Sequence, residues 1–416
     1  MKLGKNLSLY MFGRFISYVG TGIQQIAMPL YILDVTNSSM AMGIFSAVNI
    51  VPNIITLPFA GILGDKKNRK NIIIASDFLR ALFILFLSYL AICSTLTIYT
   101  LFLAQALVSV MDSIFLASST AILPELIPPD SIEGATSLRA SSDAVSMIIG
   151  PCIGGILYGI FGIKAIFLLN GLSFMISGIS SFFINYKNNS ILDSKITIKS
   201  FFKESNESIK FIRQNSALSN LFIFFMITNL IVAPFIDVVF PYILKGFLEF
   251  DSTHYSYLIS LFTVGILFGN IALSIFFKKF SNKYLIQGSL ILETAALIIT
   301  AVFVSPSMSS YTNGASLKLF LFLGISILLC GLFTSGINTP ITVNFQKMVP
   351  NQMRSRFFAV LGIACQISIP VGSLFYGFVL ARFFYEYVLA FALAIFLVSV
   401  IVFILKAPPD AYDPSI

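Results

Sequence analysis

Three carboxylates lie inside stretches of the chain that are long and apolar enough to cross a bilayer: Asp112, Asp143 and Glu293. A carboxylate without a partner in hydrocarbon holds a proton more readily than it does in water, which is what a proton-coupling site needs. We therefore predict these three as proton-coupling candidates. The alternative for Asp112 and Asp143 is permanent neutralisation by Arg14 or Arg139 in a structural ion pair.

A second group of charges surrounds a short basic turn that follows Gly61. Residues 65–70 carry five charges in six positions, so this turn must be an aqueous loop between two spans. In the next span Asp77 and Arg80 are three residues apart and can pair on one helix face. We expect these charges to latch the inner ends of the spans in one conformation, although simple stapling of the loops is equally consistent. The predicted latch consists of Gly61, Asp65, Arg69, Asp77, Arg80 and Glu125.

Polar residues at helical spacing indicate a substrate cavity. They recur along the first apolar stretch and reappear singly in others, where apolar neighbours would leave a large pocket with few polar anchors, suited to amphipathic compounds. The alternative is that they hydrogen-bond neighbouring helices to one another. The cavity candidates are Arg14, Ser17, Thr21, Gln24, Asn49, Asn53, Gln105, Thr228, Asn229, Thr334 and Asn338.

The composition requires these residues to be positioned by membrane-spanning helices. Of the 416 residues 57% are hydrophobic and 11% charged, against about 25% charged in soluble proteins. We predict an all-α membrane protein with both termini in the cytoplasm. Its twelve spans are expected at 8–34, 41–63, 71–92, 97–122, 135–160, 164–185, 217–244, 254–277, 284–304, 317–345, 356–381 and 386–405.

The polar stretch 186–216 divides these spans into two sets of six. Its part 199–213 predicts an amphipathic helix on the inner leaflet. We expect an N-terminal six-helix bundle at 1–185, a cytoplasmic linker at 186–216 and a C-terminal bundle at 217–416. Leu-Ile-Pro at 126–128 and Met-Val-Pro at 348–350 begin similar Gly- and Pro-containing spans, which favours pseudo-symmetric halves with the substrate site between them.

The charge distribution excludes several classes of protein. The net charge is +8, but most of the 26 Lys and Arg residues fall in the predicted cytoplasmic segments, which is the bias of membrane proteins and not a nucleic-acid footprint. The four cysteines are scattered, and no phosphate-binding loop, metal-ligand cluster or catalytic triad is recognisable. We expect no enzyme activity, no cofactor and no metal.

Two motifs resemble those of the major facilitator superfamily of secondary transporters. One is Gly61-Ile-Leu-Gly-Asp65-Lys-Lys-Asn-Arg69-Lys, in which Asn68 stands where many members have Gly. The other includes Gly150, Pro151, Gly154 and Gly155 and is similar to a signature of proton-coupled exporters of that superfamily. The resemblance implies two six-helix bundles and export against protons. The alternative for the second motif is close helix packing alone.

A longer set of matches resembles the branch that holds macrolide-efflux proteins and enterobactin exporters. It runs from Gly13-Arg14 through the basic turn to Asp77-Phe-Leu-Arg80-Ala81 and Leu123-Pro124-Glu125. The chain departs from many antiporters of the superfamily at Gln105, where they carry an arginine tied to proton handling.

These observations predict a multi-pass transporter of a bacterial cell (plasma) membrane, acting as a monomer. It would exchange protons for an amphipathic small molecule, such as a macrolide-like drug or a siderophore, by alternating access. We expect membrane lipids as its surroundings and no nucleic-acid partner. Two alternatives stay open: a lysophospholipid transporter of the same fold, and a polytopic sensor or scaffold that transports nothing.

Overall fold

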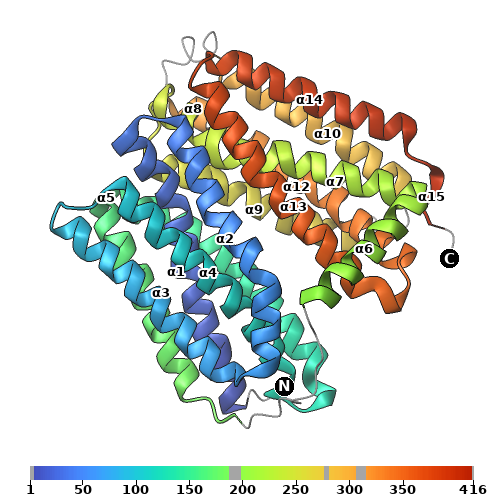
Figure 1. Cartoon of the computed structure of the whole chain (residues 1–416). Helices are drawn as coiled ribbons and strands as arrows, with labels where there is room; N and C mark the ends of the chain where they lie inside the picture. The colour runs from blue at the N-terminus through green and yellow to red at the C-terminus, as the bar shows by residue number, and fades with distance from the viewer. Residues whose placement is uncertain (1–3, 187–197, 276–280, 306–314, 415–416) are drawn as a thin grey trace. The chain divides into compact units, whose positions relative to one another are not determined.

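The chain folds almost entirely into helices, as a computed structural model shows for residues 4–186, 198–275, 281–305 and 315–414 (Figure 1). Ten of the described helices are long and apolar enough to cross a membrane. One of them, α5 (Ile132–Phe182), contains two spans joined at Gly162, whose φ of 69° is a left-handed conformation that favours glycine. Counting α5 twice and adding the more polar α1 gives twelve spans, which confirms the predicted fold class.

The helices form two compact units. Unit 1 comprises residues 1–35 and 48–201, and unit 2 comprises residues 36–47 and 202–416, so the first turns of α2 belong to unit 2. The helices in unit 1 are α1 (Lys5–Thr36), the greater part of α2 (Ser39–Lys66), α3 (Arg69–Ile92), α4 (Ile98–Ile122) and α5. Two short 3₁₀ turns, η1 (Leu123–Glu125) and η2 (Pro129–Ser131), link α4 to α5.

Unit 2 contains the remaining helices and one irregular turn. Its π-helical turn η3 (Phe235–Val239) follows Pro234 and connects α7 to α8. The helices are α6 (Ile198–Gln214), α7 (Ser216–Pro234), α8 (Phe240–Gly246), α9 (Ser252–Ile275), α10 (Asn282–Phe303), α12 (Leu317–Met348), α13 (Asn351–Leu380), α14 (Tyr385–Lys406) and α15 (Pro409–Tyr412).

Capping residues explain why several helices begin where they do. The side chain of Asn68 accepts a hydrogen bond from the backbone of Asn71 at the start of α3, so the residue that departs from the family motif serves as a helix cap. Thr97 and Thr100 form a reciprocal capping box at the start of α4. Both caps satisfy backbone N–H groups that the helix itself cannot bond.

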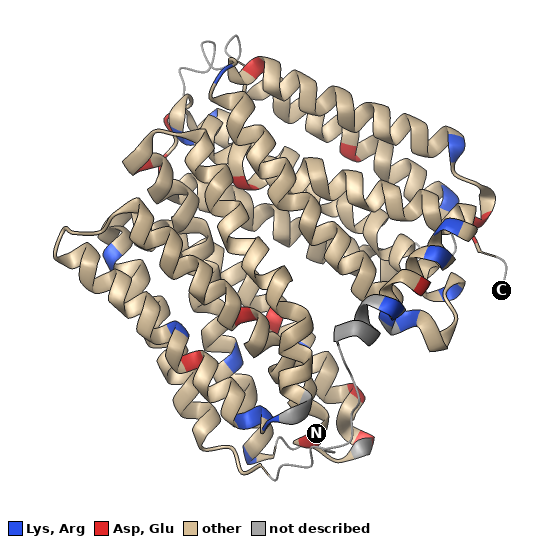
Figure 2. Cartoon of the chain, in the orientation of Figure 1, with Lys and Arg blue, Asp and Glu red and all other residues tan. Residues whose placement is uncertain are grey.

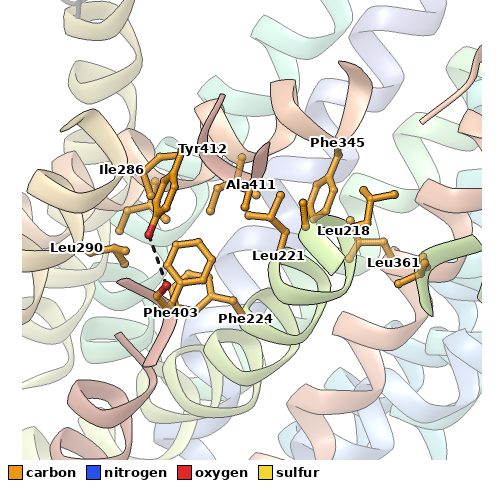
Figure 3. Close-up of a cluster of buried hydrophobic side chains, with 14 of the residues drawn as sticks. Leu218, Leu221, Phe224, Ile286, Leu290, Phe345, Leu361, Phe403, Ala411 and Tyr412 are labelled. Carbon is orange, nitrogen blue, oxygen red and sulfur yellow. Dashed lines mark hydrogen bonds between the residues drawn. The ribbon is translucent and has the colours of Figure 1, made fainter. Parts of the chain in front are cut away.

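Apolar packing holds unit 2 together. Phe224 of α7 stacks on Phe403 of α14, with ring centroids 4.3 Å apart (Figure 3). The segment after α14, residues 407–413, folds back onto this cluster, and we call it the C-terminal strap. Within it, Tyr412 is 3% exposed, and its hydroxyl donates to the Phe403 carbonyl at 3.4 Å.

The predicted domain division remains a prediction. Residues 187–197 of the expected linker lie outside the described residues, and α6 covers the expected amphipathic stretch. In α6, Ser208 and Ile212 are buried and Ile212 joins the apolar cluster of unit 2. Lys210 and Arg213 of the same helix are exposed.

Candidate functional site

Arg14 is the centre of one buried cluster in unit 1. Its guanidinium binds both carboxylate oxygens of Asp143, at 2.7 and 2.9 Å, and donates to the hydroxyls of Ser119 and Tyr18 at 2.9 and 2.7 Å. Arg139 lies 3.5 Å from the same carboxylate. A two-pronged guanidinium–carboxylate pair is a strong and directional contact. Arg14, predicted to line a substrate cavity, is 3% exposed and occupied by these partners.

Arg80 is the centre of a second cluster. It pairs with Asp77 on its own helix and with Asp112 of α4, the latter at 2.8 Å. Its guanidinium also lies over the rings of Phe115 and Phe174, at 4.0 and 4.3 Å from their centroids. Two carboxylates thus share one guanidinium. The Asp77 side chain is fully buried, whereas that of Asp112 is 30% exposed.

A third set of contacts ties the ends of the helices in unit 1. Arg69, at the start of α3, pairs with Glu125 and donates to the carbonyls of Gly64 and Ala121 at 3.1 and 3.3 Å. Tyr186 donates to the same carboxylate, and its burial together with this hydrogen bond raises the pKa of Tyr186 to about 12. The predicted latch is therefore split: Arg69 and Glu125 meet here, while Asp77 and Arg80 meet deeper.

The two remaining latch residues are Gly61 and Asp65. Gly61 is exposed and has open space around it. Asp65 lies in α2, and its side chain is not among those described.

Four amide side chains form a continuous hydrogen-bonded chain across unit 1. Asn170 donates to Gln24 at 2.7 Å, Gln24 donates to Gln105 at 3.1 Å, and Gln105 donates to Asn49 at 2.8 Å. The hydroxyl of Ser109 donates to the backbone carbonyl of Asn49 at 2.6 Å. Three predicted cavity residues are thereby joined, and Gln105 acts as an amide link between helices.

The other cavity candidates are mostly bonded within their own helices. Thr21 donates to the carbonyl of Ser17, and Thr228 and Asn229 both donate to that of Phe225. The hydroxyl of Ser17 is buried and has no partner among the described residues. Asn53 is half-buried and Asn338 is exposed.

Glu293 lies in α10 of unit 2 and differs from the other two proton-site candidates. It is 6% exposed, and among the described residues no Lys or Arg pairs with it. Its carboxylate is 2.6 Å from the hydroxyl of Thr334, which also lies 2.8 Å from the carbonyl of Cys330. A hydroxyl has one proton, so Thr334 can donate to an ionised Glu293, or accept from a protonated one while donating to Cys330.

The glycine and proline motif lies where α5 meets α1. A Cβ on Gly150 would stand 2.9 Å from Gly22 Cα and from the carbonyl oxygen of Val19, and one on Gly154 would stand 2.8 Å from the carbonyl of Ile23. Pro151 and Gly155 are buried in the same stretch. Only a residue without a side chain allows this approach, so the motif performs helix packing in this structure.

Reasoning from the sequence missed several partners of the charged residues. Ser119 and Tyr18 complete the Arg14 cluster, Ser177 donates to Asp77 at 2.8 Å, and Asn170 begins the amide chain. Serines inside apolar stretches carry little signal, because a lone hydroxyl can bond its own helix. Helical spacing would have found Tyr18, four residues after Arg14 on the same helix, but not Ser119, Ser177 or Asn170, which lie on other spans.

The geometry defines a helical membrane protein of the transporter type: twelve spans, buried ion pairs, an intramembrane amide chain and a carboxylate without a cation. Charged residues are a minority along the helices (Figure 2). Among the described residues no three His, Cys, Asp or Glu side chains are placed to hold a metal. Buried groups of this kind support binding and proton exchange rather than covalent chemistry.

Comparison with known proteins identifies the family. The family model described as Major Facilitator Superfamily matches residues 10–240 and 235–415, so the chain belongs to that superfamily. Macrolide efflux protein A of Streptococcus pyogenes is 22% identical over 362 residues, covering 86% of this chain and 85% of that protein. Multidrug resistance protein 2 of Bacillus subtilis is 25% identical over 387 residues, covering 88% and 90%. The chain is a multi-pass bacterial membrane transporter similar to the macrolide-efflux branch.

Solved structures agree on the fold. A bacterial homologue of the iron transporter ferroportin, in an inward-facing state, aligns with a TM-score of 0.75 at 15% identity, covering 98% of this chain and all of that one. The nucleoside transporter NupG aligns with a TM-score of 0.75 at 14% identity, covering 97% and 100%.

Proposed function

We propose that this protein exports an amphipathic small molecule in exchange for protons, by alternating access, as a monomer with both termini in the cytoplasm. The name of the relative Macrolide efflux protein A supports the direction of transport. The observation that carries the coupling is Glu293, a buried carboxylate whose described partner is a hydroxyl and not a cation.

The number of cations beside each carboxylate separates the three candidates. Asp143 faces two arginines, so its ionised form is doubly compensated. Asp112 shares the single charge of Arg80 with Asp77. Glu293 has none, and an ionised carboxylate without compensation is costly in low dielectric. Protonation of Glu293 removes that cost, while Thr334 retains a hydrogen bond in either state. We assign Glu293 as the main coupling site, Asp112 as a secondary one and Asp143 as structural.

We assign substrate recognition in unit 1 to Asn49, the last residue of the amide chain. Asn49 is half-buried, and its carbonyl groups are taken by Gln105 and Ser109. Its N–H₂ group is free to donate to an oxygen of the substrate. A molecule with a large apolar surface and a few oxygen acceptors suits this arrangement, which includes drug-like amphiphiles of the macrolide type.

The test is accumulation of a labelled macrolide in inside-out vesicles with an imposed pH gradient. Glu293→Gln should reduce gradient-driven accumulation to the level of empty vesicles, because the neutral side chain cannot exchange a proton. Exchange of labelled for unlabelled macrolide without a gradient should persist. Asp112→Asn should weaken accumulation partly.

Thr334→Val serves as a matched variant, since it removes the hydroxyl partner and retains the carboxylate. It should shift the pH dependence of accumulation without abolishing it. Normal gradient-driven accumulation by Glu293→Gln would overturn the coupling assignment. Flip-flop of labelled lysolipid without macrolide uptake would overturn the substrate assignment in favour of a lipid.

A further inference from the structure

Polar groups line the seam between α10 and α12 in unit 2. At each of four levels a polar side chain of α10 meets a polar side chain or a glycine of α12. From the end that contacts the C-terminal strap, the pairs are Asn282 with Asn344, Ser289 with Gly336, Glu293 with Thr334, and Thr300 with Ser326. Successive pairs advance along α10 and go back along α12, as in two antiparallel helices packed side by side. We call this set the polar seam.

The two helices approach closely along the polar seam. The Asn282 amide donates to the Asn344 side chain at 3.4 Å, and the hydroxyls of Thr300 and Ser326 lie 2.7 Å apart. A Cβ on Gly336 would stand 2.2 Å from the hydroxyl oxygen of its partner serine, so that hydroxyl lies against the backbone of α12. The polar groups therefore meet one another across the helix pair.

The length of the polar seam matches the thickness of a bilayer. Asn282 and Thr300 are about 18 residues apart along α10, or ~27 Å, and the hydrocarbon region is about 30 Å thick. Glu293 lies between them. Hydrogen bonding between helices accounts for amides and hydroxyls at a seam, but it does not require a carboxylate without a cation, which is costly there. Intramembrane carboxylates in such surroundings mark ion and proton routes.

The C-terminal strap closes one end of the polar seam. Asn344, which is fully buried, donates to the strap carbonyls of Ala411 and Tyr412 at 2.9 and 2.8 Å. Tyr412 belongs to the apolar cluster that also contains Leu290, three residues before Glu293 on α10 (Figure 3). A strap held in this way keeps water from entering the seam at that end.

We propose that the polar seam is a proton route through unit 2, with Glu293 as its proton-binding group and the C-terminal strap as the gate at one end. The inference rests on the proposed function and deepens it, because the proton then has a route of its own, apart from the substrate contact assigned to Asn49 in unit 1. A proton that enters the seam binds the Glu293 carboxylate, and Thr334 then accepts from it while donating to the Cys330 carbonyl. When that proton leaves toward the other end, the ionised carboxylate and its hydrogen bond from Thr334 return, so the net change is one proton moved.

The test is dissipation of a pH gradient by the purified full-length protein in liposomes, without macrolide. A pH-sensitive dye inside the liposomes reports the proton flux, and valinomycin with potassium on both sides prevents a membrane potential. Tyr412→Ala removes the ring that holds the strap in the cluster. It should raise the flux about tenfold, the change expected when closure is weakened by about 1.4 kcal/mol. Asn344→Leu loosens the strap from α12 and should raise the flux too, whereas Tyr412→Phe retains the ring and should stay close to wild type.

Second changes in the Tyr412→Ala background identify the route. Adding Glu293→Gln should return the flux to the wild-type level, because glutamine binds no proton. Adding Thr300→Val should also lower the flux, since valine has the shape of threonine without the hydroxyl. Thr294→Val is the matched control, because Thr294 is buried next to Glu293 but donates to the carbonyl of Leu290 in its own helix at 2.7 Å. It should leave the flux unchanged.

Three results would overturn the proposal. They are a wild-type flux in both Tyr412→Ala and Asn344→Leu, a raised flux that persists after Glu293→Gln, and an effect of Thr294→Val as large as that of Thr300→Val. Failure of the proposed function is a different result, because there Glu293→Gln accumulates macrolide normally in a pH gradient. If Glu293→Gln loses accumulation but loosening the strap leaves the flux unchanged, the proposed function stands and the route does not.

Discussion

The two units bury their charges in opposite ways. In unit 1 the buried charged side chains of the described part are Arg14, Asp77 and Arg80, and each belongs to an ion pair. In unit 2 the corresponding side chain is Glu293, whose partner is a hydroxyl. Breaking a buried pair leaves an uncompensated charge, whereas protonating a lone carboxylate removes one. Unit 1 therefore holds buried charges that are compensated by ion pairs, and unit 2 holds in Glu293 a buried carboxylate without a cation among the described residues.

The cohesion of the two units differs accordingly. Unit 1 relies on arginine clusters and the amide chain, both of which cross between helices. Unit 2 relies on the apolar cluster around Phe224 and Phe403, closed by the C-terminal strap (Figure 3). Asn344, fully buried in α12, donates to the carbonyls of Ala411 and Tyr412 at 2.9 and 2.8 Å and so fastens the strap.

The largest expected effect comes from breaking the Arg80 cluster. Arg80→Met leaves the fully buried Asp77 without its cation, which should lower the free energy of unfolding by about 3–5 kcal/mol. Thermal unfolding can be followed with a maleimide dye that reacts with the buried Cys330, in a background in which the exposed Cys93 and the half-buried Cys152 and Cys365 are replaced by Ser.

The control restores neutrality in the same cluster. Adding Asp77→Asn and Asp112→Asn to Arg80→Met should recover a large part of the loss, since no buried charge then lacks a partner. Glu293→Gln should cost little by the same assay. An unchanged melting temperature for Arg80→Met, or a loss as large for Glu293→Gln, would contradict the difference between the units.

A smaller effect is expected from loosening the strap of unit 2. Asn344→Leu removes two hydrogen bonds and leaves two buried carbonyls without donors, a loss of about 1–3 kcal/mol. Carboxypeptidase should also remove residues 407–413 faster. Gln346→Leu, at an exposed position of the same helix, should do neither. If Asn344→Leu matched wild type in both assays, the strap would contribute nothing to unit 2.

The positions of the membrane-spanning helices were predictable, because the length of an apolar run in the sequence shows where a helix can cross the membrane. The break at Gly162 falls between the predicted spans 135–160 and 164–185, although the helical trace continues through it. The partners of the charged residues were harder to predict from the sequence. Asp112 and Arg80 are 32 residues apart, and their meeting depends on the rotation of α3 against α4, which spacing within one helix cannot report.

The π-helical turn η3 (Phe235–Val239) was also beyond sequence reasoning, because nothing in the residue types after Pro234 distinguishes such a turn from a continuing α-helix. The roles assigned to the candidate site residues stay predictions, since the geometry identifies which groups meet and not which of them moves.

The smallest expected effect separates a solvated carboxylate of unit 2 from the buried ones. Asp251 is 63% exposed in its side chain and lies outside the spans. Partial burial alone would raise the pKa of Asp251, but hydrogen bonds from the His254 backbone and ring lower it overall from 3.8.

A lowered folded-state pKa means that the ionised carboxylate stabilises the fold above about pH 4, and that this contribution disappears as the pH falls through the folded-state pKa. Because the pair is screened by water, Asp251→Asn should cost less than about 1 kcal/mol at pH 7 and a smaller amount at pH 2. The measurement is the melting temperature of wild type and of Asp251→Asn at pH 7 and at pH 2. A difference in melting temperature that increased on acidification would mean that the Asp251 carboxylate is poorly solvated, as that of Glu293 is. It would contradict the distinction between the solvated and the buried carboxylates of unit 2.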